Sequence, residues 1–151
     1  MRKGNFKEAN EACDEAIRLN PELAEAWGNK GNAILGQGNF REAIEAYDEA
    51  IRLYEKFSLN LAGLAGAWCS KGNALVCLNK YDEAIKACDE AIKFNPKLAE
   101  AWTIKGIALK AHGLNTDANM AFAKAKELGY NGKFRLTSIL HHFLRLRFCI
   151  I

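Results

Sequence analysis

The sequence predicts an all-α solenoid of antiparallel helix pairs, and three observations support this fold class. A segment recurs along the chain, helical periodicity runs through each copy, and turn residues separate the helices. The tryptophans Trp27, Trp68 and Trp102 occupy equivalent positions, 41 and then 34 residues apart. Self-similarity at this period is typical of stacked repeats, in which each unit buries its apolar face against its neighbours.

The first helix of each copy carries the tryptophan. Trp27, Gly31 and Ile34 fall at i, i+4 and i+7 and therefore share one helix face. A Lys-Gly pair follows all three tryptophans, at Lys30-Gly31, Lys71-Gly72 and Lys105-Gly106. Glycine inside a helix costs about 1 kcal/mol relative to alanine. We therefore expect the glycines to permit close approach of the paired helix. Its small residues are Ala43, Ala84 and Ala118.

The second helix of each copy presents one apolar stripe. In the first complete copy, the stripe consists of Phe40, Ala43, Ile44, Tyr47, Ala50 and Ile51. Gly38-Asn39 separates the two helices with a turn. Asn-Pro at 20–21 and 95–96 is expected to end the second helix, because the residue before proline avoids helical geometry.

These units divide the chain into an array over residues 1–130 and a basic amphipathic helix or tail over residues 131–151. The array contains a half repeat at 4–21 and repeats at 24–57, 65–98 and 99–130. Seven extra residues near 54–60 stand at the end of repeat 24–57, which lacks the closing proline, and before repeat 65–98. We expect them to lengthen the second helix, and Ser58 or Asn60 to cap the next one.

The order of Trp27, Gly31, Ile34, Gly38 and Phe40, followed by alanines, resembles the tetratricopeptide repeat family, and Pro96 supplies the family's closing proline in the next copy. The resemblance covers residue 4 to about residue 130. It implies a right-handed superhelix whose first helices line a concave groove that holds an extended peptide or a partner helix. The pentatricopeptide repeat, which would imply RNA, lacks this tryptophan-glycine signature.

The resemblance places one face of each first helix in the groove. The candidate peptide-binding residues there are Asn29, Asn32, Cys69, Ser70, Asn73, Val76, Thr103, Ile104 and Ile107. Asn32 and Asn73 occupy equivalent positions, and an asparagine amide both donates and accepts, so it can bond a peptide backbone. An ordinary polar helix surface is the alternative interpretation.

Two charged patterns bear on the ligand. One subfamily grips chaperone C-terminal carboxylates with cations, but Gly28, Gly66 and Ile104 stand at the cationic positions here, so we do not expect such a clamp. The recurring lysines can pair with acids of the second helix within their own repeat, or remain solvated, or receive an acidic ligand. Lys105 is expected to be the free one, because Ala123-Lys124 replaces the acidic pair in its repeat.

Signatures of catalysis are absent from the sequence. It contains no phosphate loop, nucleophile elbow or His-Glu-x-x-His motif, so we expect no enzyme activity and no cofactor. The spacing of His141, His142 and Cys149 is a poor match to a metal site, and none is expected. The five cysteines have no paired spacing, and no apolar run reaches bilayer length, which together favour a cytoplasmic location.

The charge is concentrated in residues 131–151. Lys133, Arg135, Arg145 and Arg147 stand there without any acid, whereas the formal charge is +3 for the whole chain and therefore −1 for residues 1–130. This segment can cap the array, associate with another copy, lie on an anionic membrane, or be an artefactual extension.

Two function classes follow from these patterns. The first is a protein interaction scaffold that binds a peptide or partner helix in the groove. The second is a self-assembling module that oligomerises through its open half repeat and apolar tail. Only the basic segment 131–151 would suggest a membrane or nucleic-acid partner, and we do not expect either.

Overall fold

The computed structural model describes residues 3–57 and 60–130, and every regular element in these ranges is an α-helix. The seven helices are α1 (Lys3–Leu19), α2 (Ala24–Gln37), α3 (Phe40–Phe57), α4 (Leu61–Cys77), α5 (Tyr81–Phe94), α6 (Ala99–Ala111) and α7 (Asn115–Glu127). The predicted all-α class is confirmed. The proposed segment 131–151 and its histidine and cysteine candidates lie outside the described residues.

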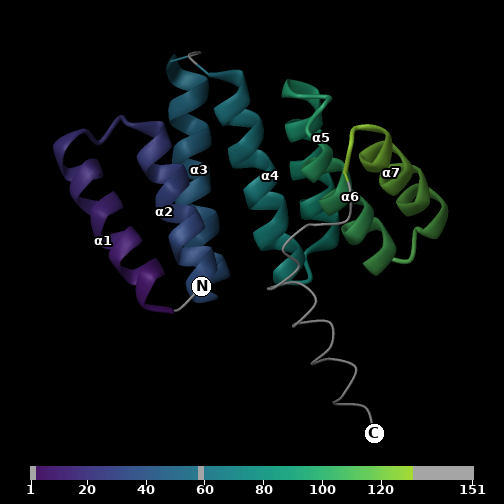
Figure 1. The fold of residues 1–151 in the computed structure, drawn as a ribbon, viewed down its shortest axis with the longest axis horizontal. Helices are drawn as coiled ribbons and strands as arrows, with labels where there is room; N and C mark the ends of the chain where they lie inside the picture. The colour runs from purple at the N-terminus through teal and green to yellow at the C-terminus, as the bar shows by residue number, and fades with distance from the viewer. Residues whose placement is uncertain (1–2, 58–59, 131–151) are drawn as a thin grey trace, which may run out of the picture.

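The helices stand side by side in chain order, from α1 at one end to α7 at the other (Figure 1). Each helix packs against the helices that precede and follow it. In addition, α4 packs against both α2 and α6, whereas the second helices α1, α3, α5 and α7 make no comparable contacts with one another. Because the tryptophan-bearing helices approach each other more closely than the second helices do, the array curves with α2, α4 and α6 on its inner side.

The predicted helix ends at Asn-Pro are confirmed. Helices α1 and α5 stop just before Asn20 and Asn95, and each asparagine side chain accepts a hydrogen bond from a backbone N–H two residues on. The proline carbonyls also have partners. Trp27 Nε1 donates to the carbonyl of Pro21 at 3.0 Å, and Trp102 Nε1 makes the same 3.0 Å bond in the last repeat. The Asn-Pro turn therefore anchors the indole of the following helix.

The seven extra residues lengthen both neighbouring helices. Helix α3 has 18 residues where its counterpart α5 has 14, and α4 begins four residues before the position equivalent to the start of α2. Asn60 caps α4 by accepting a hydrogen bond from Gly63 N at 2.9 Å, as expected. No Asn-Pro turn precedes α4, so the proline carbonyl that accepts the indole N–H in the other repeats is missing. Trp68 Nε1 is buried without a partner. An unsatisfied buried donor costs about 1–3 kcal/mol.

In each repeat, the glycine four residues after the tryptophan leaves space for a side chain of the paired helix. A Cβ added at Gly31 would lie 2.5 Å from the Tyr47 ring, and one at Gly106 would lie 2.6 Å from the Phe122 ring. The expected close approach is confirmed, but the residue facing each glycine stands one turn beyond the predicted alanine. The alanines remain buried beside these contacts, and their small size lets the helix backbones come together.

The recurring lysines join adjacent repeats. Lys30, Lys71 and Lys105 each place Nζ 2.5–2.7 Å from an aspartate on the second helix that precedes them in the chain. The aspartates are Asp14, Asp48 and Asp89. Each Nζ also lies 5.1–5.6 Å from the ring centroid of the tryptophan of its own helix. Of the three alternatives, pairing with acids of the second helices is found, but with those of the preceding repeat, and the expectation of a free Lys105 was wrong.

The glycine contacts give a paired stability prediction. Gly31→Ala should destabilise the fold by about 1–3 kcal/mol, because Tyr47 is fully buried and has to move. Gly66→Ala should stabilise it by up to about 1 kcal/mol, because nothing lies within 4 Å of the added Cβ and alanine favours the helix. Urea unfolding of the two variants measures both effects. Equal effects of the two substitutions would contradict the packing described.

Candidate functional site: a polar pocket on the inner side

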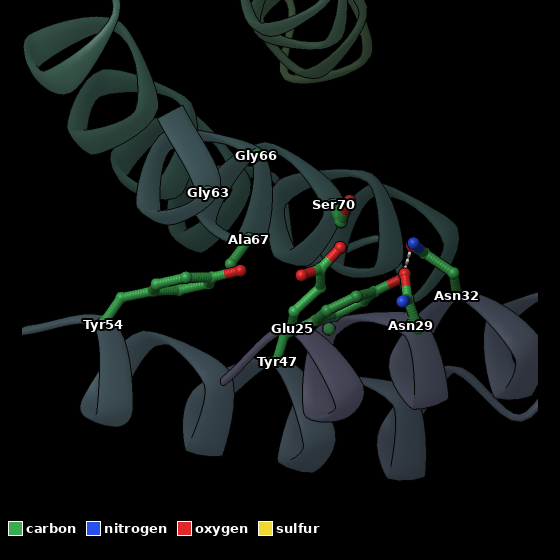
Figure 2. Close-up of a pocket in the computed structure, with 10 residues that line it drawn as sticks. Glu25, Asn29, Asn32, Tyr47, Tyr54, Gly63, Gly66, Ala67 and Ser70 are labelled. Carbon is green, nitrogen blue, oxygen red and sulfur yellow. Dashed lines mark hydrogen bonds between the residues drawn. The ribbon is translucent and has the colours of Figure 1, made fainter. Parts of the chain in front are cut away.

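A pocket of about 190 Å³ opens between α2 and α4. Its lining residues come from three helices, with α3 beneath and the two tryptophan-bearing helices on either side (Figure 2). They are Glu25, Gly28, Asn29, Asn32, Tyr47, Tyr54, Gly63, Gly66, Ala67 and Ser70. The pocket therefore lies where the curvature of the array predicts a groove.

The wall contributed by α4 is made of small residues. Gly63, Gly66, Ala67 and Ser70 fall within two turns of this helix. Gly66 has open space where a side chain would project. Small side chains expose the helix surface, so a ligand can approach α4 closely from this side.

Two tyrosines of α3 form the base of the pocket. Tyr47 and Tyr54 are seven residues apart, two helical turns or about 10 Å along the axis. The Tyr47 hydroxyl donates to Asn32 Oδ1 at 2.8 Å, and it also interacts with Ser70. Burial raises the pKa of Tyr47 above its ordinary value, so its phenol stays protonated and remains a donor near neutral pH. The bond holds Asn32 in place across the α2–α3 interface.

The second tyrosine lies beside a carboxylate. Figure 2 shows the Glu25 side chain extending from α2 toward α4, between Tyr54 and Tyr47. Partial burial, with a smaller contribution from the negative charge of Glu25, raises the pKa of Tyr54. Glu25 has no ion-pair partner among the described residues.

A second carboxylate approaches from the next repeat. Glu100, in the first turn of α6, interacts electrostatically with Tyr47 and Cys69. Its side chain keeps contact with solvent, yet the surrounding protein removes enough water to raise the pKa of its carboxyl group. Glu100 itself does not line the pocket, but its charge acts on Tyr47, which does.

The structure divides the predicted groove residues into two groups. Asn29, Asn32 and Ser70 line the pocket. Asn73 is half-buried one turn beyond Ser70, with its Oδ1 buried and without a hydrogen-bond partner. Ile107 is half-buried and packs against the core. Three of the nine candidates therefore line the pocket, and their role in binding stays a prediction.

The expected exposure of the other four residues is wrong. Cys69, Val76, Thr103 and Ile104 are buried, none of them more than 4% exposed. The direct contact of α4 with α6 covers the face that the resemblance had assigned to the groove. Thr103 Oγ1 donates to the carbonyl of Ala99 at 2.9 Å, within its own helix. None of these four side chains lines the pocket.

Tyr47 and Tyr54 are the residues that the sequence analysis missed as pocket residues. Tyr47 belongs to the apolar stripe of the second helix, which indicates core packing. Tyr54 falls in the inserted residues, where no repeat position can be assigned to it. The spacing of seven residues between two tyrosines is the only signal that could have linked them.

Neither reactive thiols nor a metal site is found in the described parts of the chain. Burial raises the pKa of Cys77 to about 11 and that of Cys88 to about 12, so these thiols are protonated near neutral pH. No group of three His, Cys, Asp or Glu side chains in residues 3–57 and 60–130 could hold a metal ion. None of the helices in these ranges has the length and apolar character needed to cross a membrane.

The chain is similar in sequence to a known repeat family. Residues 1–56 and residues 65–98 each match the tetratricopeptide repeat. No curated protein sequence matches the chain.

Solved structures with the same fold cover most of the chain. MamA from Desulfovibrio magneticus RS-1 is 22% identical with a TM-score of 0.71, covering 85% of this chain and 68% of that one. The Arabidopsis OM64 TPR domain is 26% identical with a TM-score of 0.66, covering 74% and 87%. The second TPR of Spaghetti (RPAP3), bound to the HSP90 peptide SRMEEVD, is 25% identical with a TM-score of 0.62, covering 75% and 98%.

The desolvation of Glu100 predicts a pH effect on stability. A raised pKa means that the folded chain holds this proton more tightly than the unfolded chain, whose ordinary value is 4.5. The contribution of Glu100 to the free energy of unfolding is therefore largest below that value, and it decreases as pH rises through the folded pKa. Glu100→Gln cannot ionise, so its stability relative to wild type should increase between pH 3.5 and pH 7 in urea unfolding. A pH-independent difference would contradict the burial described.

Proposed function

Because the chain belongs to the tetratricopeptide repeat family, we propose that it is a non-catalytic scaffold that binds an extended segment of a partner protein on its inner side. Proteins of this family generally mediate protein–protein interactions. The open pocket between α2 and α4 is the observation that indicates which surface binds the segment. We assign the binding of the segment to this pocket and the groove around it.

The chemistry of the pocket suits a peptide backbone. Asn29, Asn32 and Ser70 bring amide and hydroxyl groups to the surface, and these groups can pair with the N–H and C=O groups of an extended chain. Asn73 lies one turn beyond Ser70, outside the pocket lining, and in this proposal it borders the groove without giving its buried Oδ1 to the peptide. In this proposal Ile107 contacts the ligand at the edge of the groove, while the buried Cys69, Val76, Thr103 and Ile104 support the wall.

The RPAP3 structure supports a peptide ligand, since that domain was solved with one. The positions at which a carboxylate clamp requires cations are occupied here by Gly28, Gly66 and Ile104. Gly28 and Gly66 have no side chain to offer, and Ile104 is buried. The proposal is therefore a peptide groove of different chemistry.

A blocked groove tests this proposal. Gly66→Trp should fold normally, because the added side chain projects into open space, yet it should fill the pocket. We expect proteins that bind the groove to be captured at least about tenfold less by this variant than by wild type, as measured by quantitative mass spectrometry. Ala123→Trp adds an indole at an exposed site of α7, away from the pocket, and serves as the control. Equal capture of every partner by both variants would argue against the groove.

Self-association is a second candidate, and one observation favours it. Large apolar side chains are exposed at both ends of the array, with Leu19 of α1 at 71% and Met120 of α7 at 64%. Contact between such surfaces of two copies would produce a mass that rises with concentration. Light scattering of wild type and of a Leu19→Ser, Met120→Ser variant measures this. A constant monomer mass for wild type would exclude assembly through these ends.

A further inference from the structure

We propose that the inner pocket selects a positively charged peptide segment, with a lysine or arginine side chain held between Glu25 and Glu100. This inference rests on the proposed function, because it specifies which partner the groove accepts. It is carried by the arrangement of charge around the pocket and by the polar side chains of its lining.

The two glutamates occupy equivalent positions of the first and third repeats. Each stands two residues before a tryptophan, at the start of α2 and of α6. The middle repeat has Gly66 at this position, and no atom lies within 4 Å of where its Cβ would be. The array therefore presents a carboxylate, an open space and a second carboxylate in succession along its inner side.

These carboxylates lack counter-ions, unlike the three aspartates that face the recurring lysines. Asp14, Asp48 and Asp89 each pair with a lysine of the next repeat. Those lysines are consequently engaged elsewhere, and no lysine, arginine or histidine lines the pocket. Among the described residues neither Glu25 nor Glu100 forms an ion pair.

The surroundings of the carboxylates favour a cation over a neutral group. Glu100 is already partly desolvated, so a bound cation would interact with it more strongly than with a fully hydrated carboxylate. The partly exposed Tyr54 brings an aromatic ring to the base of the pocket, and an ammonium or guanidinium group is attracted to the face of such a ring.

Neutral acceptors extend the same preference. Asn29 and Ser70 line the pocket and can accept hydrogen bonds there, whereas the unpaired Oδ1 of Asn73 is buried outside the lining. A group rich in N–H donors, such as guanidinium, satisfies several acceptors at once. An acidic peptide, by contrast, would meet two carboxylates and no cation, which disfavours it by like-charge repulsion.

Three matched peptides test the charge preference on the full chain. The acidic peptide is Ser-Arg-Met-Glu-Glu-Val-Asp. The neutral peptide replaces its three acids by Gln, Gln and Asn, the basic peptide replaces them by lysine, and both of these carry a C-terminal amide. Fluorescence anisotropy gives the affinities at low salt, and amide NMR shifts of Gly63, Gly66 and Ser70 report occupation of the pocket.

We expect the basic peptide to bind at least about tenfold more tightly than the neutral one and to shift the pocket amides. Glu25→Gln combined with Glu100→Gln should remove this difference. Glu42→Gln changes a first-turn acid of α3 that does not line the pocket, and it should keep the difference. Equal affinity for the basic and neutral peptides, or a preference that survives in the double variant, would overturn the inference.

The outcomes separate this inference from the proposed function. If all three peptides shift the pocket amides equally, the peptide groove stands and the cation preference is wrong. If no peptide shifts them, the cation preference is wrong, and the groove is then judged by the Gly66→Trp experiment alone.

A further variant distinguishes a partner from the chain's own basic residues. Replacing Lys133, Arg135, Arg145 and Arg147 by glutamine removes the positive side chains of residues 131–151. An unchanged affinity for the basic peptide supports a separate partner. An affinity that rises at least about tenfold would assign the pocket to the chain's own segment and would overturn the proposal.

Discussion

The packing of each tryptophan-bearing helix between two second helices is the interaction on which the whole array depends. On one side its glycine admits a side chain of the following helix, such as Tyr47 against Gly31. On the other side its lysine reaches back to an aspartate of the preceding helix, as Lys71 does to Asp48. Because both contacts recur with the repeat, each copy fixes the position of its neighbours, and the stack needs no long-range connection.

The pocket is a consequence of this packing. Helix α4 approaches α6 closely enough to bury Thr103 and Ile104, whereas between α2 and α4 Gly66 leaves open space and Gly63 lies against the Tyr54 ring. The seven extra residues contribute as well, because they place Tyr54 at the base of the pocket. The same insertion removes the carbonyl that would pair with Trp68 Nε1. The insertion thus removes the hydrogen bond of Trp68 and, at the same time, adds Tyr54 to the pocket.

Unpaired carboxylates on the inner side complement this geometry. Most charged groups of the described helices form ion pairs within one helix or between repeats, and exposed pairs of this kind contribute about 0–1 kcal/mol each. Glu100 differs, since it is partly desolvated without a compensating partner. A partly desolvated group that is unfavourable for the isolated protein is a natural place for an interaction with a ligand.

The sequence by itself determined the helices, their turns, the tryptophan-glycine faces and the cap at Asn60, because these depend on residues close together in the chain. It did not determine the partners of Lys105 or the burial of Cys69 and Thr103. It also did not bring Tyr54 together with Glu25, which lies on a different helix. Only the tertiary structure decided these features, since the distance between neighbouring repeats is set by side-chain volumes on several helices at once, and the spacing within one helix carries no information about it.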